Sequence, residues 1–391
     1  MRAVDIPART YRHDMSAAAY FDNGSTTAVA NEVIEEMLPF FTAVYGNPAS
    51  IHSMGDAAAK AISVARKRTA SAMGCRPSEI IFTSGGTESD NLAVMGAVIR
   101  SGKKKVITSA VEHSAVLEAC GRLREMGYDI TVIPVDGEGY VDTDGISNAA
   151  DGDTALVSVM AANNVIGTIQ PIAELAKIAH ENGALFHTDA VQAFTKTDID
   201  VKRDGIDMMS VSGHKIHGPK GTGALYVRSG VELTPMILGG GQEHGLRSST
   251  ENVPGIAGIG KAAELVMLTM DDDVKRMAKM RDKIINEILS IKGSYLNGPV
   301  RNRLCSNAHF GFSGVKGNDI VLALSKMGVY ASAASACSAG STEPSHVMTA
   351  IGRSAQEALS SLRISLSRYT TEDEVNILLD ALPKALRSVR K

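Results

Sequence analysis

The sequence of 391 residues has few cysteines, no excess of charge of either sign and no long hydrophobic run. Its four cysteines, Cys75, Cys120, Cys305 and Cys337, lie far apart, and none shares a CxxC or Cys/His spacing with another. We therefore expect neither structural disulfides nor a conventional zinc site. Three of them suit small buried apolar positions, whereas Cys337 lies among small, turn-forming residues and is a candidate functional thiol.

The charge is nearly balanced, with 40 basic against 43 acidic residues. This balance gives no electrostatic reason to expect nucleic acid or an anionic membrane as a partner, although a local basic patch for an acidic protein stays open. No apolar run approaches the roughly 20 residues that span a bilayer, and the N-terminal segment lacks the apolar core of a signal peptide. We expect a cytoplasmic protein with a short, poorly ordered leader.

The remaining composition, 44% hydrophobic and 21% charged, is that of an ordinary globular protein long enough for two domains. Seven short apolar runs, most of them separated by helical segments, lie at residues 80–83, 106–109, 130–133, 155–160, 184–186, 208–211 and 224–227. This alternation predicts an α/β fold in which helices cover both faces of a seven-stranded, mainly parallel sheet.

The expected domain boundaries follow from a change of pattern near residue 266. The predicted sheet domain fills residues 25–265. A helix with a single apolar stripe begins near Asp271, and a capping box at Thr371 announces a C-terminal helix. We expect residues 266–391 to form a smaller α+β domain that carries Cys337, and residues 1–24 to form an N-terminal segment that joins it.

Two of the apolar runs end in residues that suggest chemistry. Asp189 follows the run at 184–186, and Lys215 follows the run at 208–211. Open α/β sheets bind ligands in the crevice at the carboxyl ends of their strands. Lysine can form a Schiff base and aspartate can hold a pyridinium nitrogen protonated, so the pair predicts a pyridoxal phosphate site.

A phosphate site is the second element that such a cofactor requires. Ser84-Gly85-Gly86-Thr87 joins the run at 80–83 to a helical segment. Free N–H groups and the helix dipole make such a turn a ready anion site, although an ordinary capped helix would read the same way.

Further polar groups follow other strands. His113 could stack on a flat ring or move a proton, or it could be a surface cap. Asn164 and Gln192 offer amide hydrogen bonds. The polar segment 239–250 has no evident packing role, and we interpret it as a functional or interfacial loop.

Together these motifs resemble those of the cysteine desulfurases of the NifS/IscS type, which are class V, fold-type I pyridoxal phosphate enzymes. The likeness runs from Tyr20 to about Thr371. The segments that carry it are residues 82–89, 187–192, 212–221, 239–250, 335–338 and 343–346. The resemblance implies the fold-type I transferase fold and pyridoxal 5'-phosphate as cofactor.

The resemblance also implies a role for each group around the cofactor ring. Lys215 would bind the cofactor covalently and then act as the base at the substrate Cα. Asp189 would pair with the pyridine nitrogen, and Gln192 would bond the phenolic oxygen. His113 would stack on the ring and take part in proton transfer.

The phosphate and the substrate would be held by a second set of residues. Thr250 would reach the phosphate from the partner subunit of a homodimer. Asn164 and Arg363 would bind the carboxylate of L-cysteine, the arginine in a bidentate manner. The other implied phosphate ligands are Gly86, Thr87, Ser212 and His214.

By the same resemblance, Cys337 would attack the substrate sulfur, which leaves L-alanine and an enzyme persulfide. Its loop resembles the longer type found in enzymes that pass sulfur to an iron–sulfur scaffold protein, and another acceptor protein stays open. No metal is expected, except that Cys337 could transiently bind an iron–sulfur cluster.

Some positions depart from the family pattern. Gly86 stands where alanine is usual, whereas Ser249 and Ala333-Ala334 stand where glycine is typical. Without these glycines the backbone has fewer accessible conformations, so the loops are expected to be less mobile than in the family.

Two alternatives remain at this point. A related class V enzyme, such as a selenocysteine lyase or an aminotransferase, would keep Lys215 and Asp189 without using Cys337. A degenerate paralogue could instead act as a binding or regulatory subunit.

Overall fold

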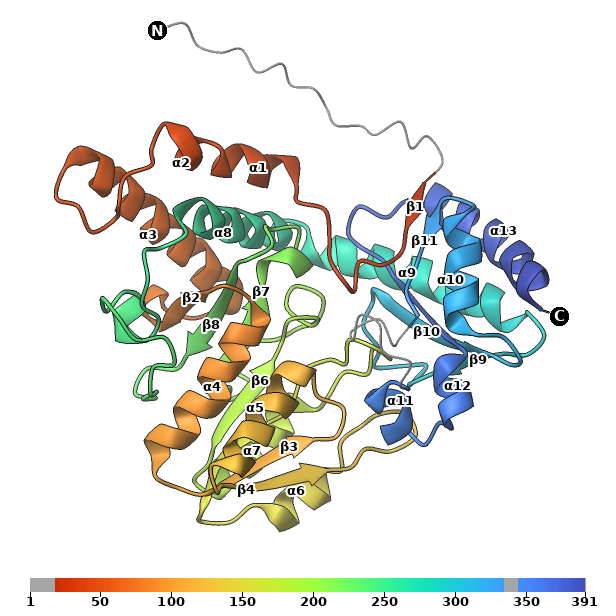
Figure 1. The fold of residues 1–391 in the computed structure, drawn as a ribbon, viewed down its shortest axis with the longest axis horizontal. Coiled ribbons are helices and arrows are strands. Elements are labelled where there is room, and N and C mark those ends of the chain that lie inside the picture. The colour runs from red at the N-terminus through yellow and green to blue at the C-terminus, as the bar shows by residue number, and fades with distance from the viewer. Residues whose placement is uncertain (1–17, 334–343, 391) are drawn as a thin grey trace, which may run out of the picture.

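A computed structural model describes residues 18–333 and 344–390 (Figure 1). Its largest element is a seven-stranded sheet in the order β2-β8-β7-β6-β5-β3-β4. Only β8 runs antiparallel to its neighbours. The bounds are β2 Ile80–Thr83, β3 Lys105–Ser109, β4 Asp129–Ile133, β5 Thr154–Ser158, β6 Leu185–Asp189, β7 Met208–Ser212 and β8 Gly223–Val227. Each coincides with one of the seven predicted runs, so the predicted α/β sheet is confirmed.

Helices cover both faces of this sheet because its central strands are apolar on both sides. One apolar cluster joins the sheet to α4 (Gly86–Ser101) and α5 (Ser114–Glu125). Another joins it to α3 (Ser53–Met73), α7 (Ile172–Glu181) and α8 (Val253–Met267). The strands therefore lie between two apolar layers, and polar groups gather where the strands end.

A second, smaller group of elements lies beside the large sheet (Figure 1). It contains an antiparallel sheet of β9 (Ser294–Asn297), β10 (Asn307–Phe312) and β12 (Ser361–Ser365). Helices α9 (Met270–Leu289), α10 (Gly317–Ser325) and α13 (Glu372–Val389) pack on it through their own apolar cluster. Ala19 and Phe21 belong to the same cluster, because β1 (Ala19–Tyr20) pairs with β11 (Val329–Tyr330).

The remaining elements are short and connect these layers. They are α1 (Asn31–Met37), α2 (Pro39–Thr42), α6 (Thr143–Ala149), α11 (His346–Ala350), α12 (Ala355–Leu359), and the 3-10 turns η1 (Pro77–Glu79), η2 (Gly213–Lys215) and η3 (Glu243–Gly245).

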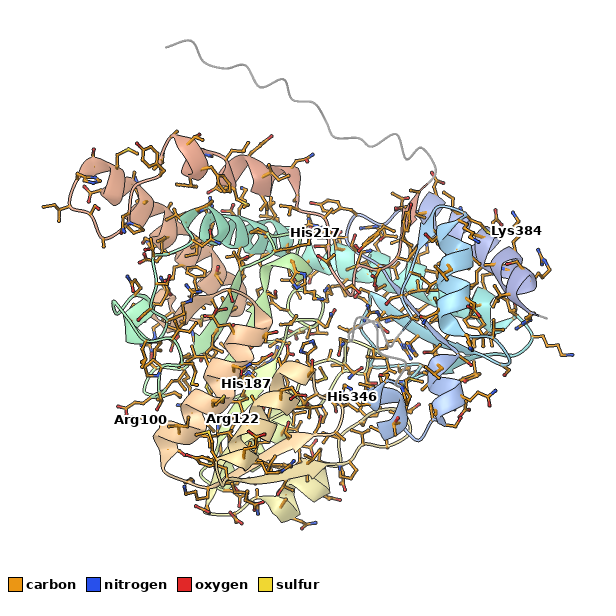
Figure 2. The ribbon with its side chains drawn as sticks, in the orientation of Figure 1. Arg100, Arg122, His187, His217, His346 and Lys384 are labelled. Carbon is orange, nitrogen blue, oxygen red and sulfur yellow. The ribbon has the colours of Figure 1, made fainter. Side chains whose placement is uncertain are left out.

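Charged side chains such as Arg100, Arg122 and Lys384 lie on the outside, whereas His187 is fully buried in the sheet (Figure 2). Within residues 18–333 and 344–390, no single helix is long and apolar enough to cross a membrane. By length and composition alone, the consecutive helices α8 and α9 pass that test as a pair bent by 75°.

The segment 239–250 does have a packing role, which the sequence did not suggest. The side chain of Glu243 is buried and forms a 2.6 Å ion pair with Arg66. Its other oxygen accepts a 2.8 Å hydrogen bond from the backbone N–H of Phe82 in β2. This glutamate therefore ties the loop to the edge of the sheet.

Candidate active site

A cavity of about 380 Å³ lies where β6 and β7 end. Ten of the residues singled out from the sequence line it, although they come from six separate parts of the chain: Gly86, Thr87, His113, Asn164, Asp189, Gln192, Ser212, His214, Lys215 and Arg363. The convergence follows from the topology, because parallel strands deliver their carboxyl ends to one edge.

Lys215 enters the cavity from η2, directly after β7. Its Nζ donates hydrogen bonds to the carbonyl oxygens of Gly24 (2.6 Å) and Ser25 (2.7 Å). The neighbouring His214 shares a 3.2 Å contact between its Nδ1 and the Thr26 hydroxyl. Burial and the nearby Lys215 lower the pKa of His214 to about 4, so its ring is neutral at pH 7.

Asp189 is the last residue of β6, and its carboxylate accepts a 2.8 Å hydrogen bond from the N–H of Val191. Burial raises the pKa of Asp189, while the nearby His113 and Lys215 act against this rise. His113 caps α5, because its Nδ1 accepts a 3.1 Å hydrogen bond from the N–H of Ala115. The cap and the cavity role are therefore compatible, since His113 also lines the cavity.

The predicted anion site lies at the start of α4, which follows β2 after a turn. The first N–H groups of a helix have no partner within it, and Gly86 and Thr87 supply them here. A Cβ at Gly86 would lie 2.7 Å from a methyl carbon of Val191. The glycine that replaces the usual alanine therefore fits here without a shift of this valine. Ser212, at the end of β7, lines the same cavity and offers a hydroxyl group as a hydrogen-bond donor.

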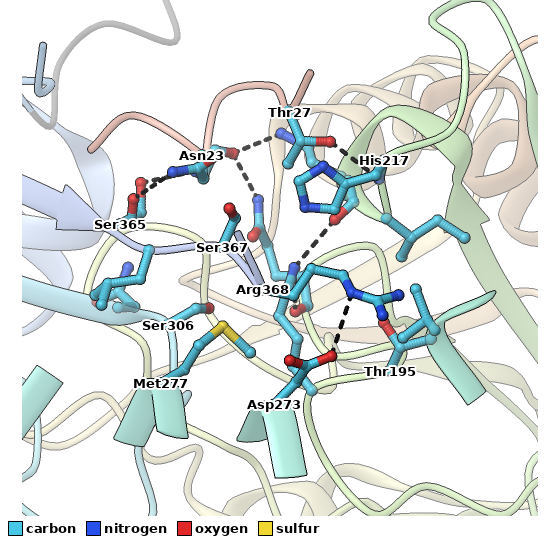
Figure 3. Close-up of a pocket in the computed structure, with 18 residues that line it drawn as sticks. Asn23, Thr27, Thr195, His217, Asp273, Met277, Ser306, Ser365, Ser367 and Arg368 are labelled. Carbon is cyan, nitrogen blue, oxygen red and sulfur yellow. Dashed lines mark hydrogen bonds and ion pairs between the residues drawn. The ribbon is translucent and has the colours of Figure 1, made fainter. Parts of the chain in front are cut away.

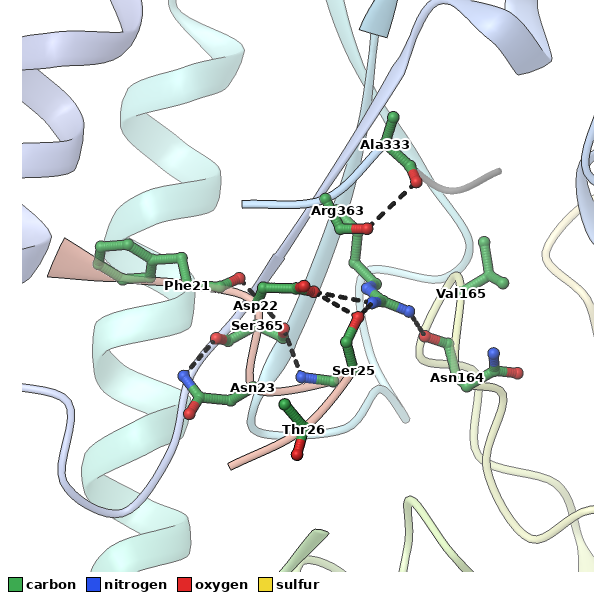
Figure 4. A network of polar contacts seen from close by, with 12 residues as sticks. Phe21, Asp22, Asn23, Ser25, Thr26, Asn164, Val165, Ala333, Arg363 and Ser365 are labelled. Atoms are coloured by element: carbon green, nitrogen blue, oxygen red, sulfur yellow. Dashed lines mark hydrogen bonds and ion pairs between the residues drawn. The ribbon is translucent and has the colours of Figure 1, made fainter. Parts of the chain in front are cut away.

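Arg363 extends into the cavity from β12 and is only 2% exposed (Figure 4). Its guanidinium donates to the Asn164 carbonyl (3.0 Å), Asp22 (3.0 Å) and the Ser25 hydroxyl (2.7 Å). Its Nε has no hydrogen-bond partner among the described residues. A guanidinium has five N–H donors, so donors remain for a carboxylate ligand.

Gln192 lies beside the lysine, and its Nε2 donates a 2.8 Å hydrogen bond to the Gly24 carbonyl. This carbonyl also accepts from Lys215. Gly24 and Ser25 were not identified as site residues from the sequence, because they provide backbone oxygens that carry no sequence signal.

Two predicted site residues are not among these ten. Thr250 is exposed and does not line it. Cys337 lies outside the described residues. In the described chain before it, Ser332 forms backbone hydrogen bonds with the cavity residue Arg363 (2.7 and 3.2 Å). In the described chain after it, His346 contacts the carbonyl of Glu112, the neighbour of His113, at 2.9 Å.

Asp90 is a cavity residue that sequence reasoning missed. It follows Gly86 by one helical turn and so faces the same way. That spacing was the available signal, but an acidic residue near a helix start also suits the helix dipole.

A second, smaller cavity also borders Lys215. Figure 3 shows the residues that line it. Its volume of about 30 Å³ is that of one or two water molecules. Residues such as Asn23, His217 and Arg368 line it. It is too small for a cofactor, so the larger cavity is the candidate active site.

Comparison with known families places this fold and cavity in a class. The profile of the family described as Aminotransferase class-V matches residues 19–378. The chain therefore belongs to the class V aminotransferase family.

The relatives within that family are more specific. The protein named cysteine desulfurase IscS from Methanosarcina thermophila is 47% identical over 375 residues, which cover 95% of this chain and 93% of that protein. The protein of the same name from Dictyoglomus turgidum is 47% identical over 379 residues, 96% of each chain. A solved structure described as a NifS-like protein has a TM-score of 0.89 and 38% identity, and covers 95% of this chain and 100% of its own. These likenesses confirm the predicted NifS/IscS family, its fold type and the enzyme class, cysteine desulfurase.

Another solved structure is described as SspA in complex with cysteine. It has a TM-score of 0.79 and 39% identity, and covers 90% of this chain and 100% of its own.

Proposed function

We propose that this chain removes sulfur from L-cysteine with the help of pyridoxal 5'-phosphate, and that L-alanine and a persulfide on Cys337 are the products. The observation that carries the proposal is the single cavity into which Lys215, Asp189 and Arg363 all project. The solved relative that contains cysteine supports the choice of substrate.

The cavity residues fit this cofactor by their chemistry. One side offers the N–H groups at the start of α4 and the hydroxyl groups of Thr87 and Ser212, which suit a phosphate. The buried Asp189 supplies the acidic group that the ring nitrogen of the cofactor requires. Gln192 and His113 supply a polar edge and a flat ring face. When bound, pyridoxal phosphate supplies an electron sink that allows bonds at the substrate Cα and Cβ to break.

The chain's own groups would orient the substrate and move its protons. Arg363 would bind the substrate carboxylate with its remaining N–H donors, next to Asn164. Lys215 would take the proton from Cα, because its amine lines the same cavity as the proposed carboxylate ligand Arg363. Two backbone carbonyls, of Gly24 and Ser25, accept hydrogen bonds from its Nζ in the present structure, and Nζ would exchange them for the cofactor and then the substrate.

Cys337 would accept the sulfur. Its thiolate attacks the substrate sulfur, an S–S bond forms, the Cβ–S bond breaks, and Cβ takes up a proton. One S–H and one C–S bond are exchanged for one S–S and one C–H bond, so the step requires no external oxidant or reductant. Enzyme persulfide and L-alanine result.

The position of Cys337 in the chain supports this role. It follows Ala333, the last described residue before it, by four positions, so their Cα atoms lie at most about 14 Å apart. Ser332, one residue earlier, pairs with the cavity residue Arg363. The described chain that leads toward Cys337 therefore runs beside a residue of the cavity.

The decisive experiment is the variant Cys337→Ala. We expect it to retain cofactor absorbance but to lose sulfide release from L-cysteine by more than about 100-fold, because no nucleophile remains for the sulfur. Mass analysis of the wild type after exposure to L-cysteine should find one extra sulfur on Cys337, and the inactive control Lys215→Ala should show none. Unchanged turnover of Cys337→Ala would instead favour a class V lyase or aminotransferase that does not use this thiol.

We also propose that sulfur passes from Cys337 to an iron–sulfur scaffold protein or another acceptor protein, and that Cys337 is a transient cluster ligand at most. Mass analysis with and without a candidate scaffold would follow the transfer. The proposed location is cytoplasmic.

The proposed organisation is a homodimer in which Thr250 reaches the phosphate of the partner subunit. Its exposure, away from the chain's own cavity, supports this arrangement. Residues 25–265 would form the cofactor domain and residues 266–391 the smaller domain. The 1–24 segment would join the latter, as the packing of Ala19 and Phe21 supports.

A further inference from the structure

Three buried acidic groups lie at or next to the active-site cavity: Asp90 and Asp189 line it, and Glu112 accepts a hydrogen bond from the N–H of Met160, which also lines it. Asp90, Glu112 and Asp189 are 1%, 0% and 6% exposed. Asp189 has an assigned partner in the proposed function, but Asp90 has none. One carboxylate oxygen each of Asp90 and Asp189 and one ring nitrogen of His113 lie within 4.8 Å of one another. Two buried carboxyl groups this close resist carrying a charge at the same time.

The surroundings of Asp90 do not support a negative charge on it. Its Oδ1 accepts no hydrogen bond from the described residues. The nearest basic group is His187, whose Nε2 lies 3.6 Å from this oxygen. However, His187 is fully buried, and burial lowers its pKa to about 3. Its two ring nitrogens instead contact the hydroxyls of Ser158 (2.8 Å) and Ser210 (3.0 Å), so the ring stays neutral.

Asp189 has the better surroundings for the charge. It accepts a hydrogen bond from Val191, and the neighbouring His113 and Lys215 both favour its ionised form against the effect of burial. For Asp90, burial and the nearby Asp189 hold the pKa well above its usual range, and the opposing effect of the Ser210 hydroxyl is outweighed. A proton shared between the two carboxyl groups therefore resides on Asp90.

We propose that Asp90 is a positioning residue that remains protonated beside Asp189 and so places the single negative charge of this pair on Asp189. This inference rests on the proposed function for its meaning, because a charged Asp189 is what a cationic cofactor ring nitrogen requires. It adds that a residue of α4, one helical turn after the proposed phosphate ligand Gly86, determines the protonation state of Asp189.

The test is infrared spectroscopy of the cofactor-free protein in D₂O at pH 7.5, which reads the C=O band of a protonated carboxyl group. We expect a band that shifts when aspartate carries a ¹³C label and that is missing from Asp90→Asn. Glu112→Gln is the matched control. Burial raises the pKa of Glu112 to about 8, so Glu112 contributes a band of its own that the aspartate label does not move.

Coupling between the two aspartates gives the second readout. In Asp189→Asn the neighbouring charge is gone, so the Asp90 band should disappear at a pH lower than in the wild type by more than about one unit. A merely structural Asp90 would not show this shift. No labelled band in the wild type at pH 7.5, or a band whose titration is unmoved in Asp189→Asn, would overturn the proposal. Neither of these two contradicting outcomes requires the variant Asp90→Asn to fold.

Measurements with cofactor separate this inference from the proposed function. Asp90→Asn keeps a neutral group of the same size and should bind pyridoxal phosphate within about threefold of the wild type, whereas Asp189→Asn should lose more than about tenfold. Loss of affinity in Asp90→Asn as large as in Asp189→Asn would mean that Asp90 carries the charge. A wild type that turns over no cysteine would refute the proposed function but leave the infrared result intact.

Discussion

Among single residues, Glu79 illustrates how a buried carboxylate can be stabilised far from the active site. It is 5% exposed, yet it forms a 3.0 Å ion pair with Arg76 and accepts hydrogen bonds from the backbone N–H groups of Arg76 (2.8 Å) and Ser229 (3.0 Å). Burial alone would raise its pKa, but these bonds outweigh burial and lower the pKa to about 2.

The variant Glu79→Gln should therefore lose stability in a pH-dependent way. The folded pKa lies below the value of about 4.3 for an unfolded glutamate, so the stabilisation is complete above that pH and fades as the pH falls toward 2. We expect a loss of about 1–2 kcal/mol at pH 7, since the exposed Arg76 is screened by solvent, and a smaller loss at pH 3. Urea unfolding at both values measures it.

The matched control is Glu232→Gln, which removes an exposed ion pair with Arg100. Such a pair contributes at most about 1 kcal/mol. A Glu79→Gln deficit that is the same at pH 3 and pH 7 would contradict the assignment.

Which residues could be predicted depended on how far their partners lie along the chain. Lys215 and Asp189 each end an apolar run, so a local pattern revealed them. Glu243 could not be found in this way, because its partner Arg66 is 177 residues distant and its own segment looks like a solvated loop. Asp90 looked like an ordinary residue of a helix start.

At the level of elements, the loop that contains η3 has a strained backbone at Ser249. Ser249 has φ = 122°, a region that favours glycine. A non-glycine residue in such a region costs about 1–3 kcal/mol. The family resemblance places a glycine at this position, and the loop leads directly to Thr250.

We therefore expect Ser249→Gly to stabilise the protein by about 1 kcal/mol, because relief of strain exceeds the extra freedom that glycine gives the unfolded chain. Chemical denaturation measures the change. The control is Ser248→Gly, which removes the hydroxyl that accepts a 3.2 Å hydrogen bond from the Gly241 N–H and should be destabilising. Loss of stability in both variants would show that Ser249 is not strained.

The elements themselves were the most predictable level. Buried parallel strands read as continuous apolar runs, and the helices between them have clear ends, as at the capping box of Thr371 and Glu374 that begins α13. The family resemblance drew attention to Ser249, but the strain itself, like the Glu243 contact, could not be predicted, because both depend on the path that distant segments impose on the loop.

For the whole molecule, one exposed apolar surface indicates that the chain binds a protein partner there. Large apolar side chains along α1, α2 and the following loop are exposed: Leu38 by 55%, Phe41 by 59% and Tyr45 by 71%. Figure 1 shows these helices at the outer edge of the fold. Contiguous exposed apolar side chains commonly mark a protein interface, and the proposed homodimer would cover them.

Subunit mixing tests whether Thr250 acts across that interface. Lys215→Ala lacks the lysine, and Thr250→Glu places a negative charge against the phosphate, so each variant alone should be nearly inactive. In a mixed dimer, the Thr250→Glu subunit keeps its own Lys215 and receives Thr250 from its partner. Random mixing makes half of the dimers mixed, each with one intact site of two, so about a quarter of the wild-type activity should return.

No recovery would mean that Thr250 serves its own subunit, because every site would then lack either the lysine or a suitable residue 250. The control adds Phe41→Glu to both variants, which puts a charge into the proposed apolar interface and should prevent pairing. Recovery that persists with Phe41→Glu, while sedimentation still shows dimers, would place the interface elsewhere on the molecule. Recovery that disappears together with the dimer would tie Thr250, the exposed face of α2 and the active-site cavity into one assembly.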